Sequence, residues 1–131
     1  MGLAFLQNLD EYRPTYNYVA ALLERGVKAL IYVGTYDWIC NFVGNEQWTL
    51  ALEWGGKEDF GKQGLREWIV NGKKAGMTRS AKGLTFATIE GAGHMASFSR
   101  LETVVLMTFF FCNRRSLTIN RKSLWNSLTV G

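Results

Sequence analysis

Two loop residues have side chains suited to acid–base chemistry: Asp37 in the stretch TYDWICN and His94 in the stretch IEGAGHMASFS. His94 is the only histidine in the chain. A histidine can act as a general base, ligate a metal or hydrogen-bond within a turn. A loop aspartate can orient such a histidine, or it can cap a turn through its own side chain. The residue types alone leave these alternatives open.

Both loops follow a predicted strand. Residues 28–34, KALIYVG, are short, apolar and rich in β-formers, which is typical of a strand buried on both faces of a parallel sheet. Residues 83–91, GLTFATIEG, alternate imperfectly between apolar and small or polar residues and predict a second strand. In open α/β sheets, active sites lie beyond the carboxyl ends of the strands. Asp37 and His94 therefore occupy positions where catalytic side chains collect.

Helical spacing of apolar residues predicts a helix on either side of the first strand. One helix covers residues 15–25 and ends before Gly26. The other covers residues 45–54, with Asn45 as its N-cap. In the glycine- and lysine-rich segment that follows, the stretches REWIV and GKKAGMTRS could form short strands of a meander or hairpin.

A third helix is predicted after the His94 loop. Ser99 and Glu102 form a capping box in front of the run LETVVLMTFFF. The most apolar part, residues 104–112, is far shorter than the roughly 20 residues of a membrane-spanning helix, so we predict a buried helix and no transmembrane segment. The stretch MGLAFLQNLDEY also lacks the basic region and the long apolar core of a signal peptide.

An aspartate that precedes a histidine fits the chain order Ser, Asp, His of α/β hydrolases. In that arrangement the aspartate orients the imidazole, and the histidine takes the serine proton and later passes it to the leaving group. The serine belongs to a G-x-S-x-G elbow upstream of the aspartate. The first serine of this chain is Ser80, downstream of Asp37, and no serine lies in such an elbow. The sequence therefore predicts an incomplete triad.

The strings YVAALLERGVKALIYVGTYDWICNFVGNEQW and LTFATIEGAGHM resemble the C-terminal part of serine carboxypeptidases, over about residues 11–107. By position, Asp37 and His94 are similar to the triad aspartate and histidine of that family. The resemblance implies a peptide substrate and release of its C-terminal amino acids, in vacuoles or outside the cell. Because the nucleophile of the family comes from sequence absent here, we expect the isolated chain to be inactive.

The same resemblance suggests residues that contact the substrate. Cys40 falls where the family has an unpaired cysteine near the substrate pocket, and Met95 falls where a methionine lines the leaving-residue subsite. Cys40 could equally be an inert buried thiol. Aromatic residues more often belong to the core, but Trp38, beside Asp37, is a candidate for lining the pocket.

We expect neither a metal nor another cofactor. A zinc site needs several histidine, cysteine or carboxylate ligands at suitable spacing. The chain has one histidine and two cysteines, Cys40 and Cys112, that are distant in sequence. The sequence does not determine whether the two cysteines meet.

The formal net charge of the 131-residue chain, +4, equals the charge of its last 19 residues. We therefore divide the chain into one domain, residues 1–112, and a weakly ordered basic tail, residues 113–131. The tail contains no acid and four basic residues: Arg114, Arg115, Arg121 and Lys122. Without clustered cations beside base-stacking elements, this excess does not predict a nucleic-acid partner. An alternative function is a non-enzymatic remnant whose tail binds an acidic partner or a membrane surface.

The predicted fold class is α/β: the C-terminal portion of an α/β-hydrolase fold, with a partial, mostly parallel sheet and flanking helices. A partial sheet leaves strand edges unpaired. We therefore also expect marginal stability or self-association of the isolated chain.

Overall fold

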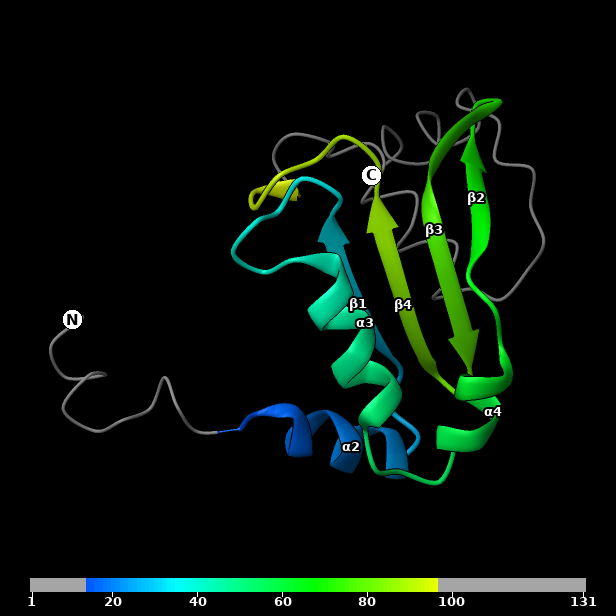
Figure 1. The fold of residues 1–131 in the computed structure, drawn as a ribbon. Coiled ribbons are helices and arrows are strands. Elements are labelled where there is room, and N and C mark those ends of the chain that lie inside the picture. Colours follow the sequence, from blue (N-terminus) through cyan, green and yellow to red (C-terminus); the bar gives the residue numbers. More distant parts are fainter. Residues whose placement is uncertain (1–13, 97–131) are drawn as a thin grey trace, which may run out of the picture.

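The computed structural model describes residues 14–96, and this part of the chain folds into one sheet with helices beside it (Figure 1). The elements follow in the order α2 (Tyr16–Glu24), β1 (Ala29–Gly34), α3 (Phe42–Ala51), α4 (Lys57–Lys62), β2 (Arg66–Val70), β3 (Lys73–Ala81) and β4 (Leu84–Ile89). None of the helices in this range is long and apolar enough to cross a membrane.

The sheet has the strand order β1-β4-β3-β2. Strands β1 and β4, distant in sequence, pair in parallel, with Ala29 opposite Leu84 and Gly34 opposite Ile89. Strand β3 pairs antiparallel with both β4 and β2. The carboxyl ends of β1 and β4 therefore lie at the same edge of the sheet (Figure 1).

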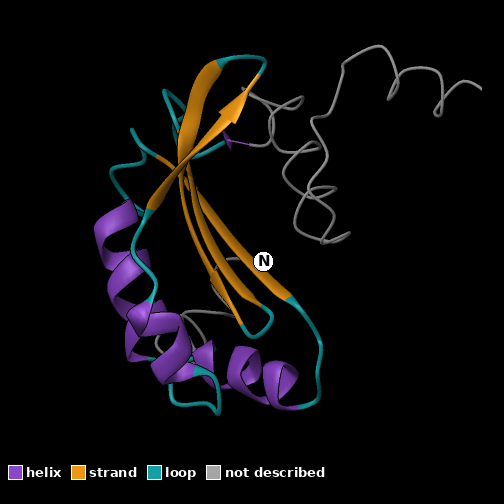
Figure 2. Ribbon diagram, turned by 90° about the vertical axis from the view of Figure 1, so that its right-hand side faces the viewer, coloured by secondary structure: helices purple, strands orange, loops and turns teal. Residues whose placement is uncertain are grey.

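Strand β4 is buried along its whole length because its two faces belong to two apolar clusters. Leu84 and Phe86 pack with residues of the helices, among them Leu23 of α2 and Phe60 of α4. On the other face, Ala87 and Ile89 pack against Ala92 and Ala96 of the following loop. Figure 2 shows the sheet nearly edge on, with α3 beside one of its faces. The core therefore fixes the strand that precedes His94.

A partly buried ion pair holds α3 against the sheet. Nη2 of Arg79, on β3, lies 2.9 Å from Oε1 of Glu46 on α3, and the two side chains are only 10% and 21% exposed. The same guanidinium donates from Nε to the carbonyl oxygen of Gln63 at 2.7 Å and lies over the ring of Phe60. Arg79 therefore joins β3 to both α3 and α4.

The α/β class and most of the predicted elements are confirmed. Helix α2 ends one residue before the predicted boundary, and Gly26 follows it with φ of +77°, a value that suits glycine. Both predicted long strands are present as β1 and β4, and the stretches REWIV and GKKAGMTRS form the hairpin β2–β3. The short helix α4 was not predicted.

The expectation of a mostly parallel sheet is wrong for the described strands, where β1 and β4 form the one parallel pair. The reason lies in the two-residue turns Asn71-Gly72 and Lys82-Gly83, in which all four residues have positive φ. Such turns join adjacent antiparallel strands, whereas a parallel connection needs a crossover of a dozen or more residues. The Asn-Gly pair was the sequence signal for the first turn.

The predicted start of the second helix is also wrong. Helix α3 begins at Phe42, and its N-cap is Asn41, whose side chain accepts a hydrogen bond from the backbone N–H of Gly44 at 2.9 Å. Asn45 lies inside the first turn. Two asparagines four positions apart can both cap a helix, so residue type did not decide between them.

Some predictions fall outside residues 14–96. These are the capping box of Ser99 and Glu102, the helix that follows it, Cys112 and the basic tail at residues 113–131. The division at residue 112 therefore stays a prediction.

Two glycines give a test of strand packing. A Cβ atom at Gly76 of β3 would lie 1.8 Å from the carbonyl oxygen of Thr88, whereas a Cβ at Gly61 of α4 would meet nothing within 4 Å. We expect Gly76→Ala to lower the free energy of unfolding by about 1–3 kcal/mol through overpacking. The matched control Gly61→Ala should raise it by about 0.5–1 kcal/mol, since alanine is the better helix residue. Denaturant unfolding measures both, and equal effects would contradict the packing described.

Candidate active site

Parallel pairing of β1 and β4 places Asp37 and His94 at one edge of the sheet. Asp37 lies in the loop after β1, and His94 lies in the loop after β4. The last residues of the two strands, Gly34 and Ile89, are partners in the parallel register. Two residues that are 57 positions apart in sequence are thereby brought to the same place.

Hydrogen bonds join the two loops directly. The backbone N–H of Thr35 donates to the carbonyl oxygen of Ile89 at 3.0 Å, and that of Tyr36 donates to the carbonyl oxygen of Ala92 at 2.9 Å. In return, the N–H of Gly91 donates to the Thr35 hydroxyl at 2.9 Å. The close approach requires a glycine at position 34, because a Cβ there would lie 2.2 Å from the carbonyl oxygen of Ala92. These hydrogen bonds therefore join the two loops into one unit.

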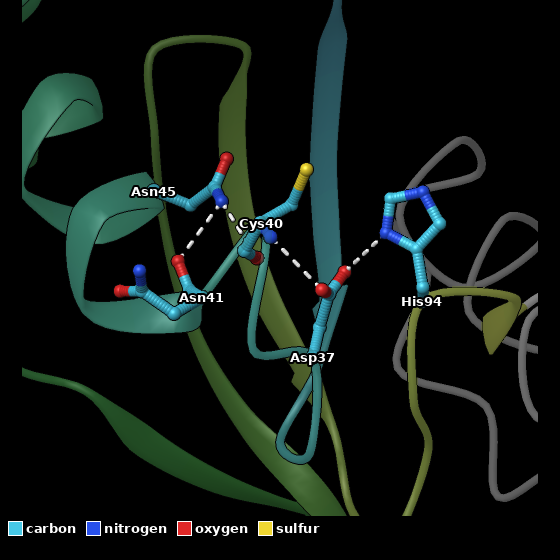
Figure 3. A network of polar contacts seen from close by, with 5 residues as sticks. All are labelled: Asp37, Cys40, Asn41, Asn45 and His94. Carbon is cyan, nitrogen blue, oxygen red and sulfur yellow. Dashed lines mark hydrogen bonds and ion pairs between the residues drawn. The ribbon is translucent and has the colours of Figure 1, made fainter.

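At the centre of this unit, Nδ1 of His94 lies 2.9 Å from Oδ2 of Asp37 (Figure 3). The other carboxylate oxygen, Oδ1, accepts a hydrogen bond from the backbone N–H of Cys40 at 2.9 Å. Because an ionised carboxylate can only accept, Nδ1 is the donor, and Nε2 is left as the basic nitrogen of a neutral ring. The Asp37 side chain is 5% exposed and that of His94 is 59% exposed, so a buried acid orients an accessible base.

The surroundings of Asp37 keep it ionised. Burial disfavours the charge and by itself raises the pKa of this carboxyl. The hydrogen bond from the Cys40 N–H, and then the hydrogen bond and charge of His94, favour the ionised form more strongly. As a result the pKa of Asp37 lies below its ordinary value. Asp37 is therefore a carboxylate at neutral pH.

Asn45 fixes the end of the aspartate loop. Its amide nitrogen donates to the carbonyl oxygens of Cys40 at 3.1 Å and Asn41 at 3.0 Å. Its amide oxygen accepts from Nε1 of Trp48 at 3.0 Å. Asn45, expected as a helix cap, instead holds the backbone that supplies the N–H donor to Asp37. In the sequence, the one sign that Asn45 could bind this backbone is its spacing of one helical turn from Asn41.

A pocket of about 220 Å³ opens beside the Asp37–His94 pair. Asp37, Cys40 and His94, all named from the sequence, line it together with five residues that were not: Tyr32, Val33, Gly34, Asn45 and Ala96. Trp38 and Met95 are not among the lining residues, and they are 88% and 57% exposed. The structure thus brings three of the five predicted residues together and leaves two at the surface beside them.

Cys40 lies closer to the pair than its sequence position indicated. Its Sγ, a carboxylate oxygen of Asp37 and a ring nitrogen of His94 lie within 4.8 Å of one another. The three residues are therefore close enough in space to hold a metal ion, although their spacing in the sequence did not indicate this. The thiol is free and exposed, so the alternative of an inert buried thiol is wrong.

Comparison with known proteins gives a consistent family match. The family model described as Serine carboxypeptidase matches residues 4–114. Carboxypeptidase Y of Schizosaccharomyces pombe is 42% identical over 108 residues, which are 82% of this chain and 11% of that relative. Carboxypeptidase Y of Komagataella phaffii is 39% identical over 98 residues, which are 75% of this chain and 19% of that relative.

The fold has a counterpart among solved structures. A prohormone-processing carboxypeptidase from Saccharomyces cerevisiae superposes with a TM-score of 0.66 at 25% identity, and the match covers 82% of this chain and 24% of that one. The chain thus spans less than a quarter of the length of each of these three relatives.

The lowered pKa of Asp37 predicts how stability depends on pH. A carboxyl whose folded-state pKa is depressed stabilises the fold above the ordinary aspartate pKa of about 3.9. This contribution is lost as pH falls through the folded-state pKa. We expect Asp37→Asn to lower the free energy of unfolding near neutral pH, and the difference from the unmodified chain to shrink below about pH 3.9. Urea unfolding at a series of pH values measures this, and a difference that is constant with pH would count against it.

Proposed function

The chain belongs to the serine carboxypeptidase family, and on this premise we propose that Asp37 and His94 are the orienting aspartate and the general base of a serine-type triad that releases C-terminal amino acids from peptides. The observation that carries the proposal is the 2.9 Å hydrogen bond between Nδ1 of His94 and Oδ2 of Asp37. It leaves the opposite ring nitrogen available for proton transfer. The names of the relatives support a peptide substrate.

In this mechanism a serine hydroxyl attacks the carbonyl carbon of the last peptide bond. Nε2 of His94 takes the hydroxyl proton as the bond to the carbonyl forms, and then donates it to the leaving amino group. Asp37 keeps Nδ1 protonated and stabilises the imidazolium that appears between the two transfers. The buried, doubly hydrogen-bonded carboxylate suits this role because it stays ionised throughout.

We further propose that the chain alone lacks the nucleophile. Among the described residues the one serine is Ser80, whose hydroxyl lies 2.8 Å from that of Thr85 near the start of β4. His94 follows the opposite end of the same strand, so Ser80 is far from the base. The elbow serine, the oxyanion-hole donors and the groups that grip the terminal carboxylate are expected in the parts of the full-length relatives that this chain does not match.

A chimera tests the triad roles directly. In the chimera, residues 4–114 of this chain replace the matching segment of the Schizosaccharomyces pombe relative. We expect the chimera to release C-terminal amino acids from a blocked dipeptide, and His94→Ala to reduce kcat at least about a thousandfold. The exposed neighbour Glu90→Gln serves as the matched control and should keep the activity. The isolated 131-residue chain should show no turnover.

Two results would overturn these assignments. A folded, active chimera whose activity survives His94→Ala would remove His94 from the chemistry. Turnover by the isolated chain that His94→Ala abolishes would show that the chain supplies its own nucleophile.

The open edge of β1 supports the proposal that the isolated chain self-associates. β1 is terminal in the sheet, so one of its edges has no strand neighbour within residues 14–96. Its sequence, ALIYVG, is free of charge, and Tyr32 on it is 39% exposed. The opposite terminal strand, β2, is protected by Arg66 and Glu67 and by an irregular register after Trp68. We therefore expect two copies of the chain to pair through the open edge of β1.

Substitutions at exposed tyrosines distinguish association through the edge of β1 from nonspecific hydrophobic association. We expect the purified chain to sediment as a concentration-dependent mixture, and Tyr32→Lys on β1 to shift it toward the monomer, because an edge lysine opposes strand pairing. Tyr18→Lys on α2, where the side chain is 71% exposed, is the matched control and should leave the distribution unchanged. A monomer at all concentrations with a sharp thermal transition would contradict self-association.

The alternative function, a remnant whose basic tail binds an acidic partner or a membrane surface, rests on residues 113–131. These residues lie outside the described part of the chain, so the alternative stays a prediction from charge alone.

A further inference from the structure

We propose that Asp37, Cys40 and His94 bind a divalent cation of the zinc class. One carboxylate oxygen, one thiol sulfur and one imidazole nitrogen lie within 4.8 Å of one another at the wall of an open pocket. Figure 3 shows the thiol of Cys40 and the ring of His94 on either side of the Asp37 carboxylate. This inference does not depend on the proposed function.

The types of ligand select the metal. Thiolate and imidazole favour borderline-soft ions such as Zn²⁺ and Co²⁺. Ca²⁺ and Mg²⁺ require shells of oxygen ligands instead, and the cluster offers oxygen from Asp37 alone. Three protein ligands beside a pocket of about 220 Å³ leave the fourth tetrahedral position for water or a small ligand.

The three side chains need only a small movement to close on the ion. Zinc–ligand bonds of about 2.0–2.3 Å place the ligand atoms of a tetrahedral site about 3.3–3.8 Å apart. The ligand atoms of Asp37, Cys40 and His94 lie within 4.8 Å of one another. The exposed side chains of Cys40 and His94 can rotate inward. Asp37 needs no such rotation, because the Cys40 N–H already holds its carboxylate in place.

The proton balance follows from the ligand atoms. The cation binds Nδ1 of His94 in place of the proton that this nitrogen donates to Asp37, and that proton moves through solvent to Nε2, so the ring stays neutral. The thiol of Cys40 loses its proton to solvent and becomes the thiolate ligand. Binding therefore releases one proton per ion, and affinity falls as pH falls. If the proposed triad role of His94 holds, the same ion blocks it, because Nε2 then carries the ring proton and cannot accept another.

Titration of the full 131-residue chain with Co²⁺ tests the site, because a cobalt–thiolate bond gives a charge-transfer absorption in the near ultraviolet. We expect one Co²⁺ per chain and displacement of the band by Zn²⁺. Cys40→Ser should abolish the band, and His94→Asn should weaken binding at least about tenfold. The other cysteine of the chain gives the matched control, since Cys112→Ser should keep the band and the affinity.

A second measurement needs no variant. Mass spectrometry of the alkylated chain follows Cys40 and Cys112 separately, and Zn²⁺ should slow alkylation of Cys40 but not of Cys112. Absence of the band, a band that survives Cys40→Ser, equal protection of both cysteines, or one ion shared by two chains would each overturn the proposal.

Discussion

The parallel pairing of β1 with β4 is the constraint on which the site depends. It sets the carboxyl ends of two strands side by side, so the loops that follow start from adjacent points. A short segment of backbone hydrogen bonds then continues the pairing beyond the sheet, from Thr35 to Ile89 and from Tyr36 to Ala92. The side-chain hydrogen bond between Asp37 and His94 lies just beyond these backbone hydrogen bonds. The side chains meet because the main chains of both loops have already been fixed.

The side chains of the site differ in exposure: the carboxylate is buried, and the imidazole and the thiol are exposed. Asp37 is buried and both of its oxygens are bound, while His94 and Cys40 are exposed. A buried carboxylate beside an exposed imidazole suits proton transfer, because the carboxylate orients the ring while the opposite ring nitrogen stays accessible. The same arrangement brings a thiol to the pair. The proposed acid–base role and the proposed cation site would therefore compete for one cluster.

Local signals in the sequence were sufficient for the elements that carry the site, but not for their arrangement. Short apolar runs ending in glycine indicated β1 and β4, and loop position indicated Asp37 and His94. The antiparallel direction of β3 depends on two-residue turns, of which Lys82-Gly83 has no strong sequence signature. Cys40 directly precedes the N-cap of α3, so its position relative to His94 depends on where that helix begins. From the sequence, either Asn41 or Asn45 could have been the N-cap. Such features arise from pairing and packing between distant segments, which residue periodicity does not encode.

The bonds that lock the two loops together use mainly backbone atoms, and this affects how the surface around the pocket can change. Side chains such as Tyr36, Trp38 and Ile39 project outward from a loop whose shape they do not determine. They can be exchanged for others without displacing Asp37. The exposed surface of this loop can therefore diverge separately from the Asp37–His94 pair, so related chains can differ in what contacts this surface while the pair keeps its geometry.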